Sequence, residues 1–103
     1  MDNICINIKN DFSDSPDGPN SGQQFYEEIL KNKFEEAKQR GVKLEINLDG
    51  VWGYPSSFVS GSFGKLSIEY SANVVLDTIV FISTESETRK ERIIEEIKHP
   101  TKK

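Results

Sequence analysis

The sequence predicts one α/β domain in two layers, a mainly parallel β-sheet with its helices mostly on one face. Segments with the twofold apolar periodicity of strands alternate with segments of helical periodicity, in the order strand, helix, strand, helix, strand, helix. The 103 residues can build one hydrophobic core and leave little room for a second, so 1–103 is predicted to be a single domain. Because βαβ crossovers are right-handed, strands added successively in one direction place their helices on the same face.

The chain begins with a predicted strand and a long polar segment. Three isoleucines alternate with other residues over 4–8, which is the pattern of a strand. Residues 10–22 are rich in Asp, Ser, Pro and Gly, and we expect them to form a long, exposed and mobile loop. Ser21 and Gln24 have the spacing of a capping box, which predicts that Ser21 caps the first helix.

The first predicted helix and the second predicted strand share an apolar contact. Apolar residues spaced by three or four form a stripe along the helix: Tyr26, Leu30, Phe34 and Ala37. Gly41 follows and can take the left-handed C-cap. Strict alternation over 42–49 then predicts a strand with one face in the core. We expect the apolar residues of that face to pack against the stripe: Leu44, Ile46 and Leu48 against Leu30 and Phe34.

A second amphipathic helix is predicted over 56–70. Its apolar residues again fall on one stripe: Val59, Phe63, Leu66 and Tyr70. The helix contains Gly61 and Gly64, and each glycine costs about 1 kcal/mol relative to alanine in a helix interior. This cost indicates close packing against another backbone, or an interruption of the helix near Gly61.

The last predicted strand is 79–82, a continuous apolar run that is typical of a strand buried on both faces. Before it, residues 71–77 fit a loop, a last helical turn or an early start of the strand. After it, Ser83-Thr84 is expected to cap a third helix over 85–98. Residues 99–103 are expected to form a flexible tail.

Composition argues against several classes of protein. The 13 basic and 17 acidic residues give a net charge of −4, so we expect no nucleic-acid partner. No apolar run approaches the roughly 20 residues of a membrane span, and the first residues lack the features of a signal peptide, so we expect a cytoplasmic protein that does not bind membranes. Cys5 and His99, the single residues of their kinds, lie at opposite ends of the sequence. We therefore expect no Cys–His catalysis, no metal, no cofactor and no enzyme.

The residues best suited to a binding function follow the second strand, because ligands of open α/β sheets bind beyond the carboxyl ends of the strands. The expected partner-binding edge consists of Asp49, Trp52, Tyr54, Ser56 and Ser57. Ser56 and Ser57 open a helix, where free backbone amides favour an anion, so either serine is a possible phosphoacceptor. The alternative is that Ser56 only caps the helix.

Four groups of residues resemble a known family. They are Ser21-Gly22 opening a helix with Phe25 and Leu30, then Ile46-Asn47-Leu48-Asp49-Gly50-Val51, then Tyr54-Pro55-Ser56-Ser57-Phe58, then Phe63-Gly64-Lys65-Leu66. In this pattern the chain resembles, over residues 4–98, the STAS-like domain family of unknown function. That family is related in fold to the sulfate transporter and anti-sigma factor antagonist (STAS) domains.

The resemblance implies a small bacterial regulatory module rather than an enzyme. In anti-sigma factor antagonists, a serine at the start of the corresponding helix is phosphorylated by a partner of the histidine-kinase ATPase type, and the unphosphorylated domain binds that partner. Ser57 aligns with this serine slightly better than Ser56 does. The resemblance thus implies an ATPase or kinase partner at the 49–64 edge. An alternative from another class is a small-ligand or nucleotide-binding module that holds a phosphate at Ser56 and Ser57.

Overall fold

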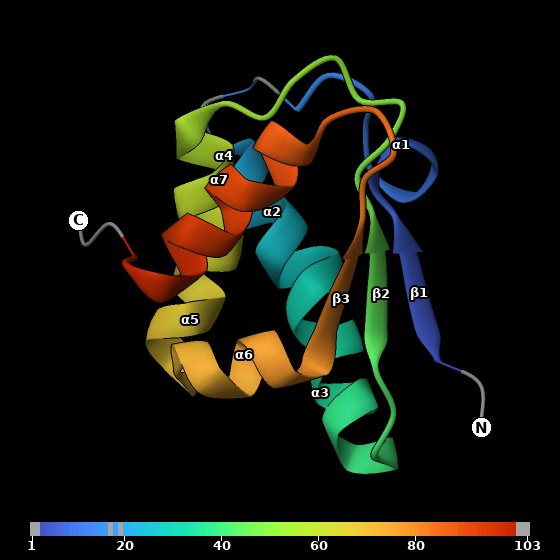
Figure 1. Ribbon diagram of the computed structural model, residues 1–103, viewed down its shortest axis with the longest axis vertical. Helices are drawn as coiled ribbons and strands as arrows, with labels where there is room; N and C mark the ends of the chain where they lie inside the picture. Colours follow the sequence, from blue (N-terminus) through green and yellow to red (C-terminus); the bar gives the residue numbers. More distant parts are fainter. Residues whose placement is uncertain (1–2, 17, 19, 101–103) are drawn as a thin grey trace.

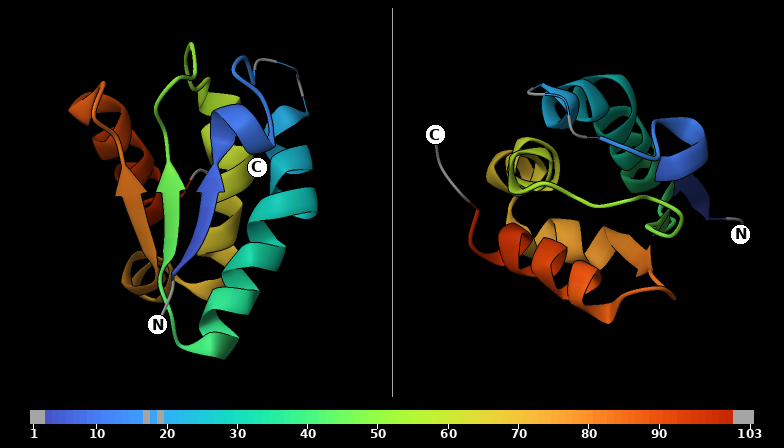
Figure 2. Two further views of the ribbon diagram at one scale, coloured as in Figure 1. Left: turned by 90° about the vertical axis from the view of Figure 1, so that its right-hand side faces the viewer. Right: turned by 90° about the horizontal axis from the view of Figure 1, so that it is seen from above.

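The computed structural model describes residues 3–16, 18 and 20–100, and it has the predicted α/β class with a parallel sheet (Figure 1). Three strands lie in the order β1 (Ile4–Asn7), β2 (Leu44–Asn47) and β3 (Ile79–Ile82), and both neighbouring pairs are parallel. The helices cover one face of the sheet, and the left view of Figure 2 shows the strands in front of them. The two-layer prediction is confirmed.

Each strand turns alternate side chains toward the helices. In the register of the sheet these residues form two rows, and all of them are buried: Ile4, Leu44 and Ile79, then Ile6, Ile46 and Phe81. The row between them is Cys5, Glu45 and Val80, on the other face, where Val80 is 44% exposed. The prediction that 79–82 is buried on both faces is therefore wrong, because the helices cover only one side of the sheet.

The polar segment after β1 is docked on the domain rather than exposed throughout. β1 ends at Asn7, one residue earlier than predicted, because the Asn7 side chain accepts from the backbone N–H of Asn10 and caps the helical turn α1 (Ile8–Asp11). Phe12 then packs against Phe25 and Phe58, with ring centroids 5.3 and 6.1 Å away. Pro16 is buried. Residues 17 and 19 of this predicted loop lie outside the described part of the chain.

The first predicted helix runs over 21–40 in three pieces, α2 (Ser21–Phe25), the π-helical turn η1 (Tyr26–Leu30) and α3 (Lys31–Arg40). Its predicted stripe is buried, and Gly41 takes the left-handed C-cap with φ of 69°. The capping box is wrong, because Asn20 holds the N-cap position. The Ser21 hydroxyl instead donates to the carbonyl oxygens of Pro16 and Gly18.

The second predicted helix runs over 56–70 as α4 (Ser56–Val59), the π-helical turn η2 (Ser60–Gly64) and α5 (Lys65–Tyr70). The two proposed explanations for its glycines both hold, because the π turn lies at the glycines and the packing there is tight. A Cβ on Gly61 would lie 3.4 Å from the backbone nitrogen of Gln23, and a Cβ on Gly22 would lie only 2.6 Å from the carbonyl oxygen of Phe58. The two helices therefore meet backbone to backbone.

The residues around β3 form two further helices. The segment with several possible structures is helical, α6 (Ala72–Thr78), and it leads directly into β3. The last helix, α7 (Glu87–Lys98), begins two residues later than predicted because Ser86 is its cap and accepts from the N–H of Arg89. His99 follows α7 with a side chain that is 76% exposed, and residues 101–103 of the predicted tail lie outside the described chain.

The core provides a direct test of the strand assignment. Ile46 lies on the central strand β2 and has no exposed surface. We expect Ile46→Ala to lower the free energy of unfolding by about 2–5 kcal/mol, because the neighbouring strands cannot close the cavity. Chemical denaturation measures this change, with Val80→Ala on the open face of β3 as a control that should cost less than about 1 kcal/mol. Equal losses in the two variants would contradict the inward orientation of Ile46.

Candidate functional site

The predicted edge lies at the carboxyl end of the sheet, where the loop from β2 to α4 passes beside the loop from β3 to α7 (Figure 1). The structure separates its five residues into two groups. Asp49 and Tyr54 make internal hydrogen bonds that hold the loop, whereas Trp52, Ser56 and Ser57 are exposed to solvent.

Asp49 ties the two loops together. Its carboxylate accepts from the N–H of Thr84 at 2.9 Å, from the hydroxyl of Thr84 at 2.7 Å and from the N–H of Glu85 at 3.0 Å. The hydroxyl of Thr84 and the N–H of Glu85 lower the pKa of Asp49, because both stabilise the ionised form. In return, the Glu85 carboxylate accepts from the N–H of Gly50 at 2.5 Å. Asp49 is half-buried, and these contacts make it a brace between the two loops at the predicted edge.

Arg89 of α7 holds the same loop from the other side. Its guanidinium donates to the carbonyl oxygen of Val51 at 2.7 Å and to that of Trp52 at 2.8 Å, and it lies over the Tyr54 ring at 5.9 Å. The Tyr54 hydroxyl donates to the carbonyl oxygen of Leu48 at 2.8 Å. Arg89 is not among the site residues predicted from the sequence, because a contact across 38 residues leaves no local pattern.

Trp52 projects from this braced loop. The residue is 82% exposed, although its backbone N–H donates to the carbonyl oxygen of Asp14 at 2.8 Å. Open hollows lie on two sides of it. One, of about 370 Å³, is lined with Gly50, Glu85 and Arg89, and the other, of about 440 Å³, is lined with Pro16, Tyr54, Pro55 and Arg92. The structure therefore presents a large aromatic side chain on a backbone that is already ordered.

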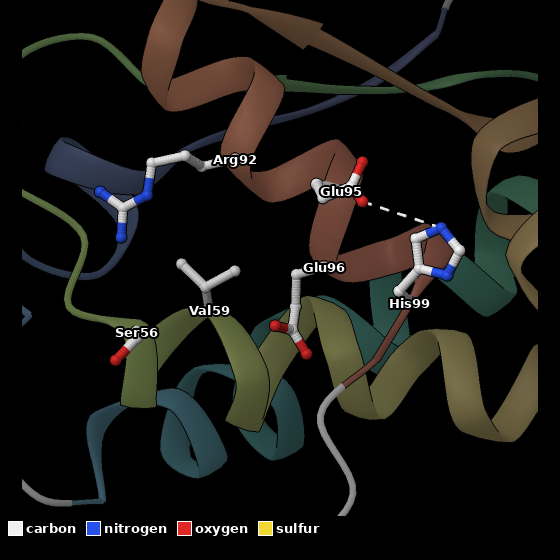
Figure 3. Close-up of a pocket in the computed structure, with 6 residues that line it drawn as sticks. All are labelled: Ser56, Val59, Arg92, Glu95, Glu96 and His99. Carbon is white, nitrogen blue, oxygen red and sulfur yellow. Dashed lines mark ion pairs between the residues drawn. The ribbon is translucent and has the colours of Figure 1, made fainter.

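Ser56 and Ser57 are the first two residues of α4, and both are exposed. Pro55 takes the N-cap position, and no side-chain hydrogen bond caps this helix, so the alternative that Ser56 acts as the cap is wrong. Ser56 lines a third hollow, of about 200 Å³, between α4 and α7 (Figure 3). Arg92 lines this hollow as well as the one beside Tyr54. Arg92 is also absent from the predicted site residues, because the packing of α7 beside α4 leaves no local pattern in the sequence.

Within residues 3–16, 18 and 20–100, the structure brings together no three His, Cys, Asp or Glu side chains that could hold a metal ion. Within the same ranges, every helix is too short or too polar to cross a bilayer.

Arg89 should be a main support of the loop that carries Trp52. We expect Arg89→Ala to lower the free energy of unfolding by about 1–3 kcal/mol, because two carbonyl oxygens lose a charged donor. The matched control is Arg92→Ala, one helical turn further along α7, which should change stability by less than about 0.5 kcal/mol. Thermal and chemical unfolding measure both variants. Equal losses would show that the guanidinium of Arg89 does not brace the loop.

The lowered pKa of Asp49 predicts a pH-dependent contribution to stability. Because folding favours the ionised carboxylate, this contribution is complete above the unfolded value of about 4 and disappears as the pH falls through the lower folded value. We expect Asp49→Asn to be less stable than the parent protein at neutral pH and to approach it below about pH 4. Thr84→Val removes one of the donors and should show a weaker form of the same dependence. Stability differences that do not vary with pH would contradict this role.

Comparison with known proteins identifies the family. The model of one family, described as a STAS-like domain of unknown function (DUF4325), matches residues 21–89, from the start of α2 into α7. This range includes the whole predicted edge, together with Thr84, Glu85 and Arg89, whereas β1 and Arg92 lie outside it. No curated protein and no solved structure shows significant similarity to the chain. With two thirds of its length matched by the model, the chain belongs to the family of STAS-like domains of unknown function.

Proposed function

We propose that this protein is a regulatory interaction module of a bacterial cytoplasmic signalling system, with no catalytic activity of its own. Its partner docks on the surface made by Trp52, Pro55, Ser56 and Ser57, here called the Trp52 surface. The single observation that carries the proposal is that Trp52 is 82% exposed on a loop held by Arg89, Asp49 and the carbonyl of Asp14.

An exposed tryptophan on an ordered loop suits a binding partner. Tryptophan is among the residues that contribute most to protein interfaces, because burying its indole removes a large apolar area from water. Binding usually costs free energy when loops become ordered, and the hydrogen bonds of Arg89 and Asp49 have already ordered this one. Among the large apolar side chains of the described residues, Ile68 at 52% and Val80 at 44% are less exposed.

The class of partner is inferred from the family. Because the chain is a STAS-like domain, we propose a histidine-kinase-type ATPase as the partner. Ser57, with Ser56 as second choice, is then the site at which phosphorylation controls binding. A phosphate on either serine would add roughly −1.5 to −2 charges to the Trp52 surface and would disfavour the docking of a partner there.

A small-ligand or nucleotide-binding function is the second candidate. It is favoured by the hollow that Ser56 and Arg92 line together, because a guanidinium beside the first residues of a helix suits a phosphate. Nucleotides alone should then raise the unfolding temperature of the protein, whereas the interaction module requires a protein partner.

Trp52→Ala tests the proposed function directly. We expect this variant to bind a candidate ATPase from the same genome at least about tenfold more weakly, because the interface loses its main apolar contact. Calorimetric titration measures the affinity. Ile68→Ala is the matched control, since Ile68 is an exposed apolar residue on α5, outside the Trp52 surface, and its loss should leave the affinity unchanged. Equal effects of the two substitutions would contradict docking at the Trp52 surface.

Ser57→Asp tests the regulatory part of the proposal. The added charge should leave the unfolding temperature close to that of the parent, because Ser57 is exposed, and should weaken ATPase binding by at least about tenfold. Ser57→Ala should bind like the parent. If Ser57→Asp binds as tightly as the parent while Trp52→Ala does not, docking at the Trp52 surface is supported and its control by phosphorylation is refuted.

A further inference from the structure

Two hollows of the candidate site meet at one residue. The hollow of about 440 Å³ is lined mainly by proline and aromatic side chains, among them Pro16, Trp52, Tyr54 and Pro55. The hollow of about 200 Å³ lies between α4 and α7 and is lined by Ser56, Val59 and three charged residues of α7. Arg92 lines both. The two hollows therefore adjoin at Arg92, and together they are here called the Arg92 surface.

The charges on this surface are separated. Among the described residues, Arg92 is exposed and makes no hydrogen bond or ion pair, whereas Arg89, one turn earlier, is engaged with the carbonyl oxygens of Val51 and Trp52. At the far end of the smaller hollow, Glu95 lies 3.7 Å from His99, and the Arg92 side chain extends away from them toward the end where Ser56 lies (Figure 3). Positive charge is therefore next to the proline and aromatic hollow.

This combination favours one chemistry in an occupant. A guanidinium binds a carboxylate through paired charge-assisted hydrogen bonds, and the prolines and aromatic rings can bury an apolar side chain beside it. A polyanion such as a nucleic acid or an anionic lipid surface is disfavoured. Arg92 is one cation, Glu95 and Glu96 line the same hollow, and the whole chain carries a net charge of −4.

We infer that the Arg92 surface docks a segment of a protein partner in which one aspartate or glutamate lies next to a large apolar residue. The inference rests on the proposed function, because it names the chemistry by which the partner is recognised at the same end of the molecule. The carboxylate pairs with Arg92, and the apolar side chain enters the hollow between Pro16 and Tyr54. Isolated carboxylates are favoured over a long acidic run, since the net charge of the protein repels the latter.

Three short peptides test this chemistry on the full-length protein. They are acetyl-Leu-Glu-Leu-Glu-amide and its counterparts with glutamine or lysine in place of glutamate. NMR titration follows the indole N–H of Trp52, the single tryptophan, and the side-chain N–H of Arg92. We expect the glutamate peptide to shift both signals and to bind at least about tenfold more tightly than the glutamine peptide at low salt, with the lysine peptide weakest. Arg92→Gln should reduce the preference for glutamate to less than about threefold.

The matched control is Arg40→Gln, which removes an exposed arginine at the end of α3, distant from the site in sequence and lining neither hollow. Arg40→Gln should leave the preference for glutamate unchanged. An equal loss of preference in both variants would overturn the inference, because the net charge of the protein would then explain the preference. Equal binding of the three peptides, or no binding, would also overturn it. If the Trp52 signal shifts with protein concentration in the absence of peptide, the occupant of the Arg92 surface is a second copy of the chain, and the inference is overturned.

The outcome separates this inference from the proposed function. An ATPase whose binding depends on Trp52 and not on Arg92 would overturn the carboxylate chemistry and leave the proposed function in place. Discrimination among the peptides without binding of any ATPase would support the carboxylate chemistry and refute the proposed partner class.

Discussion

The packing of all the large helices onto one face of a three-stranded sheet is the constraint from which the rest of the structure follows. The helix over 56–70 lies between the helix over 21–40 and α7, as the right view of Figure 2 shows. Its glycines allow this position: Gly61 faces the backbone of α2, and a Cβ on Gly64 would come within 2.7 Å of the Glu96 carboxylate of α7. The side chain of Phe63 still reaches the sheet, with its ring 5.4 Å from that of Phe81.

The same constraint assembles the candidate site. Because the strands are parallel and adjacent, the loops after β2 and β3 leave the sheet at the same end, and Asp49 can bond to Thr84 and Glu85 across 35 and 36 residues. The position of α7 beside this end allows Arg89 to bond to the loop after β2 and places Arg92 at the hollow beside Tyr54. These contacts do not involve the side chains of Trp52, Ser56 and Ser57, which remain exposed at this end of the molecule.

Much of the fold was predictable because apolar periodicity reports directly on burial. Leu44, Ile46 and Leu48 are buried as the alternation over 42–49 indicated, although regular pairing is confined to Leu44–Asn47. The errors occurred where several local patterns compete. Ser21, Ser56 and Ser83 all have the sequence context of a helix cap, and in each case a neighbour or the tertiary structure decided otherwise: Asn20 and Pro55 hold the N-cap positions, and Ser86 caps α7.

The sequence by itself determined the α/β class, the mainly parallel sheet, the inward face of β2 and the position of Trp52, Ser56 and Ser57 after that strand. These properties depend on spacings of two to four residues and on the right-handedness of crossovers, which local sequence contains. The tertiary structure alone decided that β3 is open on one side, that Asp49 joins the loops after β2 and β3, and that Arg89 and Arg92 belong to the site. The physical reason is that these roles depend on contacts between segments more than 30 residues apart, whose geometry exists only after the helices have packed on the sheet.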